Sequence, residues 1–269
     1  MKKKIFVICV LLMSHLSIAA EVDSYSGTDN YIFTARSFIN EDINNRLKNA
    51  VEKLNADEIS CAKNNKDAEE VYEYIQNALI ENISTFFVGH FIAEYFNETI
   101  PDNKKIVIPF ERSVYHDISF LDGISLWLKG TLGIIKVNGY FHFFGANYIG
   151  VDKLGHFFVE GFSFFEKAYL ENDGDISKAI KWGVETENGK YGLVTTGVFS
   201  HADLVANFNG MRFWNQILHF SDDPLEKFFY HNKPFLSCKR AKWELVKDFD
   251  LNEYTDAAWD EKINCNDYR

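Results

Sequence analysis

Residues 151–172, VDKLGHFFVEGFSFFEKAYLEN, combine a polar stripe with a group of phenylalanines on one predicted helix. Asp152, His156 and Glu160 recur at intervals of four residues, so on a helix they share one face. Five aromatic side chains surround them in the sequence: Phe157, Phe158, Phe162, Phe164 and Phe165. A helix this apolar is expected to be buried, and buried polar groups need partners. The stripe therefore predicts that another element brings polar side chains to this helix.

The predicted helix over residues 200–220 offers such partners in its first two turns. Ser200-His201-Ala202-Asp203 has the spacing of a capping box, in which Ser200 accepts from the Asp203 amide and the Asp203 side chain reaches back. Asn207 follows one turn later, where its amide either joins the same cluster or faces solvent. Capping alone accounts for Ser200 and Asp203 as well as a functional role does, so both interpretations stay open.

A metal site is a weaker alternative for the same two helices. It would use Asp152, His156 and Glu160 with His201 or Asp203, because imidazole and carboxylate groups both bind metal ions. A hydrogen-bonded Asp–His pair that joins the helices is the commoner arrangement, and we predict no cofactor. Nucleophilic catalysis by Ser200 is weaker still, because no G-x-S-x-G motif is present.

Two carboxylates, Glu185 and Glu187, come at the end of a predicted helix over residues 175–185. Negative charge is mildly unfavourable at a helix C-terminus. A partly buried carboxylate there, followed by a glycine- and threonine-rich segment, would have a raised pKa and could act as a general acid. The alternative is that both are surface glutamates.

The remaining pattern predicts a mainly α-helical domain with a small β-hairpin element, an α+β fold over residues 21–269. Further helices are expected at residues 37–54, 66–96 (one or two) and 238–249. A short strand is expected at residues 104–110. Asn138-Gly139 between apolar residues indicates a hairpin turn.

The first 20 residues have the pattern of a secretory signal peptide: three lysines, an apolar stretch and small residues at the end. Cleavage is expected after Ala19 or Ala20, which predicts a periplasmic or secreted protein. No later segment reaches the roughly 18 uninterrupted apolar residues that indicate a transmembrane helix. We therefore expect no transmembrane segment after signal cleavage.

The net charge of the chain limits the classes of partner that it is expected to bind. The chain has 28 basic and 39 acidic residues, and loss of Lys2, Lys3 and Lys4 would bring the net charge to about −14. This argues against a nucleic-acid partner and against an anionic membrane surface. It suits a neutral or cationic ligand, although solubility alone also explains it.

Three cysteines remain once Cys9 in the signal segment is removed: Cys61, Cys238 and Cys265. An exported compartment permits disulfides. Cys238 could pair with Cys265 and close a loop in the tail, or Cys61 could pair with either one. The sequence leaves the pairing open.

The order DKLGH, a later Glu, then GVFSHADLVANFNG resembles the VanZ-like group and related small periplasmic lipoproteins. The matching positions, all within residues 152–210, are Asp152, Lys153, His156, Glu185, Ser200, Asp203, Asn207 and Gly210. VanZ-like proteins are membrane-embedded, unlike the expectation for this chain, and the resemblance implies no clear activity.

The layout of residues 177–208 also resembles the lysozyme superfamily, in which a catalytic Glu ends a helix, a β-hairpin follows and another helix closes the cleft. That resemblance implies an exported hydrolase of peptidoglycan, with cell-wall polysaccharide as partner. Glu185 would be the acid, and Glu187 or Asp203 the second carboxylate. The substrate-binding positions it implies are Tyr191, Thr195, Thr196 and Ser200. De-N-acetylated strands would suit the acidic charge.

The competing hypothesis is a non-catalytic envelope protein in which Asp152, His156, Glu185 and Asp203 form one buried polar network. Burial distinguishes the two hypotheses. A cleft that opens on Glu185 would favour the enzyme, whereas a sealed, hydrogen-bonded network would favour the structural role.

Overall fold

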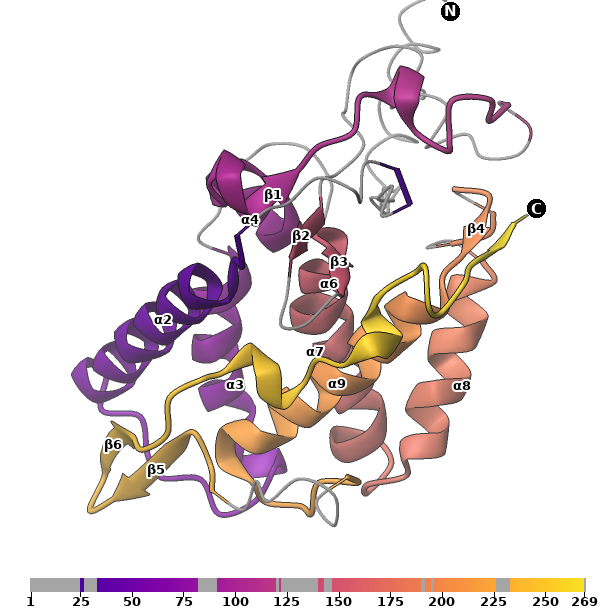
Figure 1. The fold of residues 1–269 in the computed structure, drawn as a ribbon. Coiled ribbons are helices and arrows are strands. Elements are labelled where there is room, and N and C mark those ends of the chain that lie inside the picture. The colour runs from indigo at the N-terminus through magenta and orange to yellow at the C-terminus, as the bar shows by residue number, and fades with distance from the viewer. Residues whose placement is uncertain are drawn as a thin grey trace, which may run out of the picture.

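The structure, a computed structural model, describes residues 25–26, 33–81, 91–119, 121, 140–142, 147–189, 192–194, 196–225 and 233–268 (Figure 1). It is mainly helical with small antiparallel sheets, which confirms the predicted fold class. The α-helices are α2 (Arg36–Ala56), α3 (Glu69–Gln76), α4 (Phe91–Thr99), α6 (Asp152–Gly155), α7 (Gly161–Phe165), α8 (Ile176–Glu187) and α9 (His201–Leu218).

The predicted helix over residues 151–172 is confirmed as one continuous helical column. It runs from α6 through a π-helical turn, His156–Glu160, into α7 and a second π-helical turn, Glu166–Leu170. This column packs along α9. A π-helical turn admits one extra residue, and such turns are frequent at functional sites.

Two glycines set the close approach of the column to α9. A Cβ atom added to Gly210 would lie 1.9 Å from the carbonyl oxygen of Phe157, and one added to Gly161 would lie 2.6 Å from the Gly210 Cα atom. Any larger residue would push the helices apart. Trp214 Nε1 donates to the Phe158 carbonyl at 2.9 Å and so fixes the register between the two helices.

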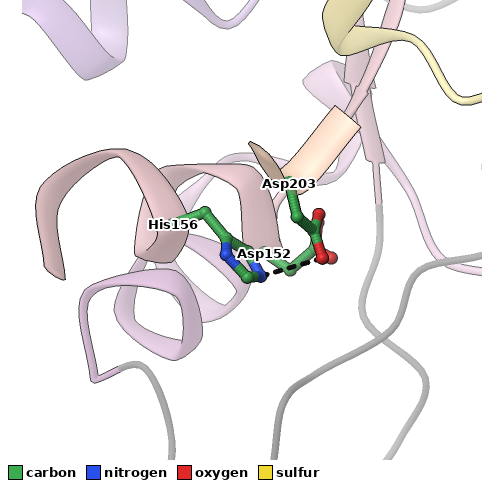
Figure 2. Close-up of side chains that lie close together, drawn as sticks. All are labelled: Asp152, His156 and Asp203. Carbon is green, nitrogen blue, oxygen red and sulfur yellow. Dashed lines mark ion pairs between the residues drawn. The ribbon is translucent and has the colours of Figure 1, made fainter. Parts of the chain in front are cut away.

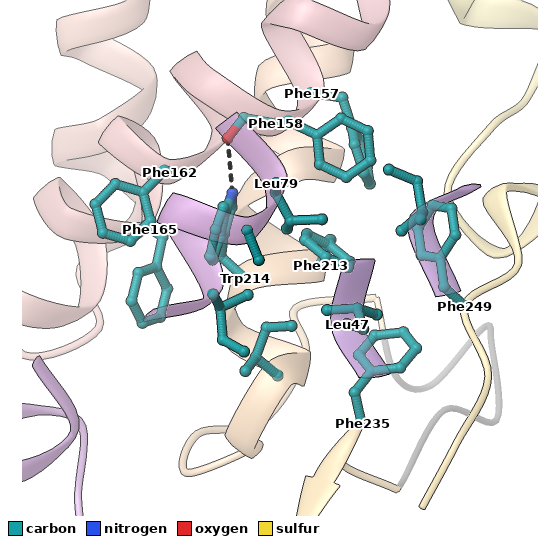
Figure 3. Close-up of a cluster of buried hydrophobic side chains, with 14 of the residues drawn as sticks. Leu47, Leu79, Phe157, Phe158, Phe162, Phe165, Phe213, Trp214, Phe235 and Phe249 are labelled. Atoms are coloured by element: carbon teal, nitrogen blue, oxygen red, sulfur yellow. Dashed lines mark hydrogen bonds between the residues drawn. The ribbon is translucent and has the colours of Figure 1, made fainter. Parts of the chain in front are cut away.

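The phenylalanines fill the core between these helices and the rest of the chain (Figure 3). Phe157 and Phe158 are fully buried, and both pack against Phe213 and Phe249, with ring centroids 5.4–6.2 Å apart. Aromatic burial of this kind contributes about 1.5–3 kcal/mol per side chain. Many of the aromatic residues that the structure describes therefore belong to the core.

The N-terminal helices follow the predicted apolar spacing. α2 confirms the helix expected at residues 37–54, and Ile39, Ile43 and Leu47 form part of its buried stripe. Of the stretch 66–96, α3 continues into a π-helical turn at Asn77–Glu81, and α4 begins at Phe91. Residues 82–90 lie outside the described residues.

Within the described residues, three small sheets accompany the helices. β1 (Lys105–Ile106), β2 (Tyr140–His142) and β3 (Tyr148–Gly150) form one antiparallel sheet in the order β1-β2-β3, which confirms a short strand within residues 104–110. The predicted turn at Asn138-Gly139 lies outside the described residues. β4 (Val198–Phe199) pairs with β7 (Asp267–Tyr268) near the C-terminus, and the described residues of the glycine-rich segment supply no strand to it.

The helix predicted over residues 238–249 is wrong. The chain instead forms a hairpin of β5 (Leu236–Lys239) and β6 (Lys242–Leu245), with positive φ angles at Arg240 and Ala241 in the turn. Tertiary contacts outweigh local propensity here. Trp243 exchanges backbone-to-side-chain hydrogen bonds with Asn55 on α2, and its indole donates to the Ile59 carbonyl at 2.8 Å.

The disulfide joins Cys61 and Cys238, which selects one of the three pairings left open by the sequence. It ties the segment after α2 to β5 across 177 residues of sequence. Cys265 is exposed and has no disulfide. From the hairpin the chain runs back along α9 towards β4, as the yellow segment in Figure 1 shows.

No helix among the described residues combines the length and the apolarity that crossing a membrane requires.

We expect removal of the disulfide to destabilise the fold. The double variant Cys61→Ser/Cys238→Ser should have a free energy of unfolding about 2–5 kcal/mol lower than the wild type, because a long loop is no longer closed in its unfolded chain. Cys265→Ser is the matched control and should leave it unchanged. Equal denaturation midpoints in urea for all three proteins would contradict this pairing.

Candidate functional site

A lysine without access to solvent lies at the centre of the polar cluster. Lys153 is the second residue of α6, and its Nζ atom lies 3.0 Å from Asp152 Oδ2, 2.6 Å from Asp203 Oδ1 and 2.5 Å from Glu261 Oε1. The side chain is 0 % exposed. A buried ammonium is tolerated only with close counter-charges, and here three elements supply them. Lys153 thereby joins α6, α9 and the C-terminal segment.

A histidine–aspartate pair, drawn in Figure 2, shares its carboxylate with the lysine. His156 Nε2 lies 3.1 Å from Asp203 Oδ2, so the Asp203 carboxylate bridges Lys153 and His156. The other ring nitrogen, Nδ1, lies 3.1 Å from the side-chain amide of Asn207 and 3.9 Å from Glu160 Oε2. The expected partnership between the polar stripe and the start of α9 is therefore confirmed.

The start of α9 is capped as predicted, but only in part. Ser200 Oγ accepts from the Asp203 amide at 3.2 Å, which confirms Ser200 as the N-cap. The return bond predicted from the Asp203 side chain is wrong, because that carboxylate binds Lys153 and His156. Glu187 Oε1 takes its place and accepts from the Ser200 amide at 3.0 Å. A carboxylate is also stabilised there by the positive end of the helix dipole.

Glu187 is enclosed by the glycine-rich segment. It is the last residue of α8 and is 2 % exposed. A Cβ atom added to Gly192 would lie 2.4 Å from Glu187 Oε1, so only glycine allows the chain to pass this close to the carboxyl group. Thr196, also buried, donates its hydroxyl to the Gly192 carbonyl at 3.1 Å and holds this segment in place.

Carboxyl groups outnumber basic groups in the cluster. Among the described residues, the ion pairs of the cluster involve two basic side chains, Lys153 and His156. The buried acidic side chains around them are Asp152, Glu160, Glu187, Asp203 and Glu261. Full ionisation would leave uncompensated negative charge in a low-dielectric interior, which is unfavourable.

The pKa values diverge accordingly. Burial, and then the negative charge of Asp203, raises the pKa of Glu187 to about 8. Burial likewise raises the pKa of Glu261 to about 7, against the opposing effect of Lys153, and raises the pKa of Asp152. For Asp203, burial acts in the same direction, but His156 and Lys153 outweigh it and hold the pKa below its usual range. Protons thus reside on Glu187 while Asp203 stays ionised.

Two influences compete at His156. Burial disfavours the imidazolium, but Asp203, Glu160 and Asp152 outweigh it and raise the pKa of His156 to about 10. The Asn207 amide opposes this. One of its atoms lies 3.1–3.2 Å from the carbonyl oxygens of His156 and Asp203 as well as from His156 Nδ1, a position that suits the NH2 group. Nδ1 then accepts, and Nε2 carries the proton towards Asp203.

The residues predicted from the sequence fall into two groups. Asp152, His156, Glu160, Glu187 and Asp203 come together, all at most 6 % exposed. Ser200 and Asn207 join them as a cap and as a partner of His156. Thr196 is buried as part of the segment over Glu187 rather than presented to a ligand.

Glu185 and His201 do not join the cluster. Glu185 is 65 % exposed on α8 and lies 3.9 Å from Lys181, one helical turn earlier. The expectation that it belongs to a buried network is therefore wrong. His201 is directed to Asp267 of β7, at 3.1 Å near the surface. Tyr191 and Thr195 lie outside the described residues.

Two essential residues had little signal in the sequence. Lys153 appeared only within the DKLGH match, because a lysine next to an aspartate normally indicates a solvated surface. Glu261 lies 58 positions after Asp203 in a tail with no helical or strand periodicity. Only the fold reveals that this tail crosses the start of α9.

Lys153→Met should destabilise the protein by about 3–5 kcal/mol, because three buried carboxyl groups lose their shared counter-charge. The deficit should shrink as the pH is lowered, since those carboxyl groups then take up protons. The measurement is urea unfolding at several pH values. Lys181→Met, which removes only an exposed ion pair, is the control, and a deficit of the same size in both variants would contradict the central role of Lys153.

Glu187 should make stability depend on pH. Its pKa is 4.5 in the unfolded chain and about 8 in the folded protein, so the folded state binds more protons between these values. The contribution of Glu187 to stability is therefore present below about pH 4.5 and is lost as the pH rises to 8. Glu187→Gln mimics the protonated form and should flatten the decline in thermal midpoint over that range. Glu185→Gln should reproduce the wild-type curve, and a decline unchanged in Glu187→Gln would disprove the assignment.

No protein-family model, curated protein or solved structure matches this chain.

Proposed function

We propose that the protein is an exported, non-catalytic envelope protein whose buried Asp/His/Lys/Glu network holds two helices and the C-terminal tail together. The observation that carries this proposal is the burial of the network: every member is at most 6 % exposed. Glu185, which has the position of the catalytic acid in the lysozyme-like layout, faces solvent in an ion pair with Lys181. This combination favours the structural role over a catalytic acid in a cleft.

Export to the periplasm or the exterior is part of the proposal. The first 20 residues have the composition of a signal peptide. The Cys61–Cys238 disulfide supports the same compartment, because disulfides persist in oxidising surroundings and are rare in the reducing cytosol. The net negative charge of the chain favours solubility and argues against a nucleic-acid partner.

A second candidate is a hydrolase of cell-wall glycan in which Glu187 replaces Glu185 as the acid. One observation favours it: the pKa of Glu187 is raised to about 8, while that of neighbouring Asp203 is lowered. Two carboxyl groups with opposite protonation states are the arrangement that glycoside hydrolysis needs. The substrate would be peptidoglycan, with de-N-acetylated strands favoured by the acidic charge. The burial of both groups counts against this candidate.

Incubation of the purified protein with peptidoglycan sacculi distinguishes the two candidates. We expect no soluble fragments by mass spectrometry from native or chemically deacetylated sacculi, because no glycan strand reaches carboxyl groups this buried. Sacculi that a known lysozyme digests in parallel serve as the positive control. Fragments released by the wild type would disprove the non-catalytic role.

Matched variants then identify the acid, should fragments appear. Activity lost in Glu187→Gln and kept in Glu185→Gln would establish the second candidate. The reverse pattern would restore Glu185. Under the non-catalytic proposal neither variant releases fragments.

A further inference from the structure

We propose that Asp152, His156 and Asp203 bind one divalent transition-metal cation, of the Zn²⁺ or Mn²⁺ class, between α6 and the start of α9. Each residue offers one ligand atom, and these atoms all lie within 4.8 Å of one another (Figure 2). The proposal goes beyond the non-catalytic role and does not depend on it, because metal binding is measured without any assay of cleavage.

The His156–Asp203 pair already has the spacing of two ligands on one ion. Two atoms that each lie about 2.0–2.2 Å from a metal, at ligand angles of about 90–110°, are about 2.8–3.5 Å apart. His156 Nε2 and Asp203 Oδ2 lie 3.1 Å apart. Ligands on opposite sides of one ion are about 4.2 Å apart. Since all three atoms lie within 4.8 Å of one another, the Asp152 oxygen would move by at most about 0.6 Å to lie opposite another ligand and by at most about 2 Å to lie beside one.

An unpaired oxygen at Asp152 points independently to a ligand. Asp152 is 0 % exposed, and its Oδ1 atom has no hydrogen-bond donor within the part of the chain that the structure describes. Lys153 binds Oδ2 of Asp152 and Oδ1 of Asp203. The other oxygen of Asp203, Oδ2, lies beside His156, and the other oxygen of Asp152, Oδ1, is the one without a donor among the described residues. A buried carboxylate oxygen without a donor is costly, and a metal ion would satisfy it.

The charge of the cluster favours a cation at this place. Among the described residues, five buried carboxyl groups surround two basic side chains, so a dication can offset negative charge that protons otherwise have to neutralise. On binding, the metal takes the place of the proton on His156 Nε2 and that proton is transferred to Nδ1, so the imidazole stays neutral and no oxidation or reduction takes place. Lys153 stays on the other carboxylate oxygens and holds Asp152 and Asp203 in position.

The donor set selects the class of metal. One imidazole nitrogen with two carboxylate oxygens suits Zn²⁺ and Mn²⁺, whereas Ca²⁺ and Mg²⁺ prefer sites made of oxygen alone. Asn207 would orient the imidazole through Nδ1, as hydrogen-bonding partners of metal-bound histidines do. Once Nε2 binds the metal, the Asn207 amide would turn so that its oxygen accepts from Nδ1–H, the orientation in which Asn207 Oδ1 lies 3.1 Å from Nδ1.

The experiment measures binding to the full chain after metal is removed by unfolding and refolding in the presence of EDTA. We expect one equivalent of Zn²⁺ or Mn²⁺ per chain by isothermal titration calorimetry, a higher thermal midpoint with metal, and weak or no response to Mg²⁺ and Ca²⁺. Co²⁺ should give the visible absorption of a nitrogen- and oxygen-bound ion. Asp152→Asn, close to the wild type in shape, and His156→Gln should each weaken binding more than the about 10- to 100-fold that loss of an outer partner costs.

The chain supplies its own control for adventitious binding. His201 and Asp267 form an exposed pair with the same 3.1 Å separation as His156 and Asp203. His201→Gln should leave affinity and stoichiometry unchanged. Absence of stoichiometric binding by the refolded wild type would overturn the proposal. So would wild-type affinity in Asp152→Asn with a native near-ultraviolet circular dichroism spectrum, or loss of binding in His201→Gln.

Discussion

The buried ammonium of Lys153 is the interaction on which the arrangement of the chain depends. It contacts carboxylates from its own helix, from the start of α9 and from the C-terminal tail, so one charge fixes three segments. Such a network need not add net stability, because desolvation offsets much of the Coulomb attraction. Its effect is on specificity: a shifted register between α6 and α9, or a displaced tail, would leave a buried charge without its partner. The network therefore selects one arrangement among many that would bury the same phenylalanines.

Close helix contact makes this network geometrically feasible. Gly161 and Gly210 let the two helices approach until no room remains for a Cβ atom between Gly210 and the Phe157 backbone. His156 is the residue before Phe157 in the same column, so it lies at the start of this close contact. The gap to α9 is short enough there for its ring to reach Asp203 directly, at 3.1 Å. A wider helix spacing would separate the imidazole from the carboxylate that accepts from its Nε2–H.

The sequence predicted the parts of this structure that depend on local spacing. The apolar stripe of α2, the Ser200 cap and the polar face of residues 152–160 all follow from helical periodicity, and each is confirmed. It failed where distant contacts decide. Residues 236–245 form a hairpin because Cys61 and Asn55 hold its strands, and Glu261 enters the cluster only because the tail crosses α9. Long-range contacts of this kind leave no periodic pattern in the sequence.

The choice between Glu185 and Glu187 shows how a helix separates two nearby carboxylates. They are two residues apart, so on α8 they point in directions about 200° apart. The Glu185 carboxylate faces water beside Lys181. The Glu187 side chain accepts a hydrogen bond from the Ser200 amide and lies against Gly192. Burial, with the negative charge of Asp203, gives Glu187 the raised pKa of a general acid, yet the same enclosure keeps a polymer away from it. A perturbed pKa is therefore evidence of a low-dielectric, acidic interior, and access must be established separately before it becomes evidence of catalysis.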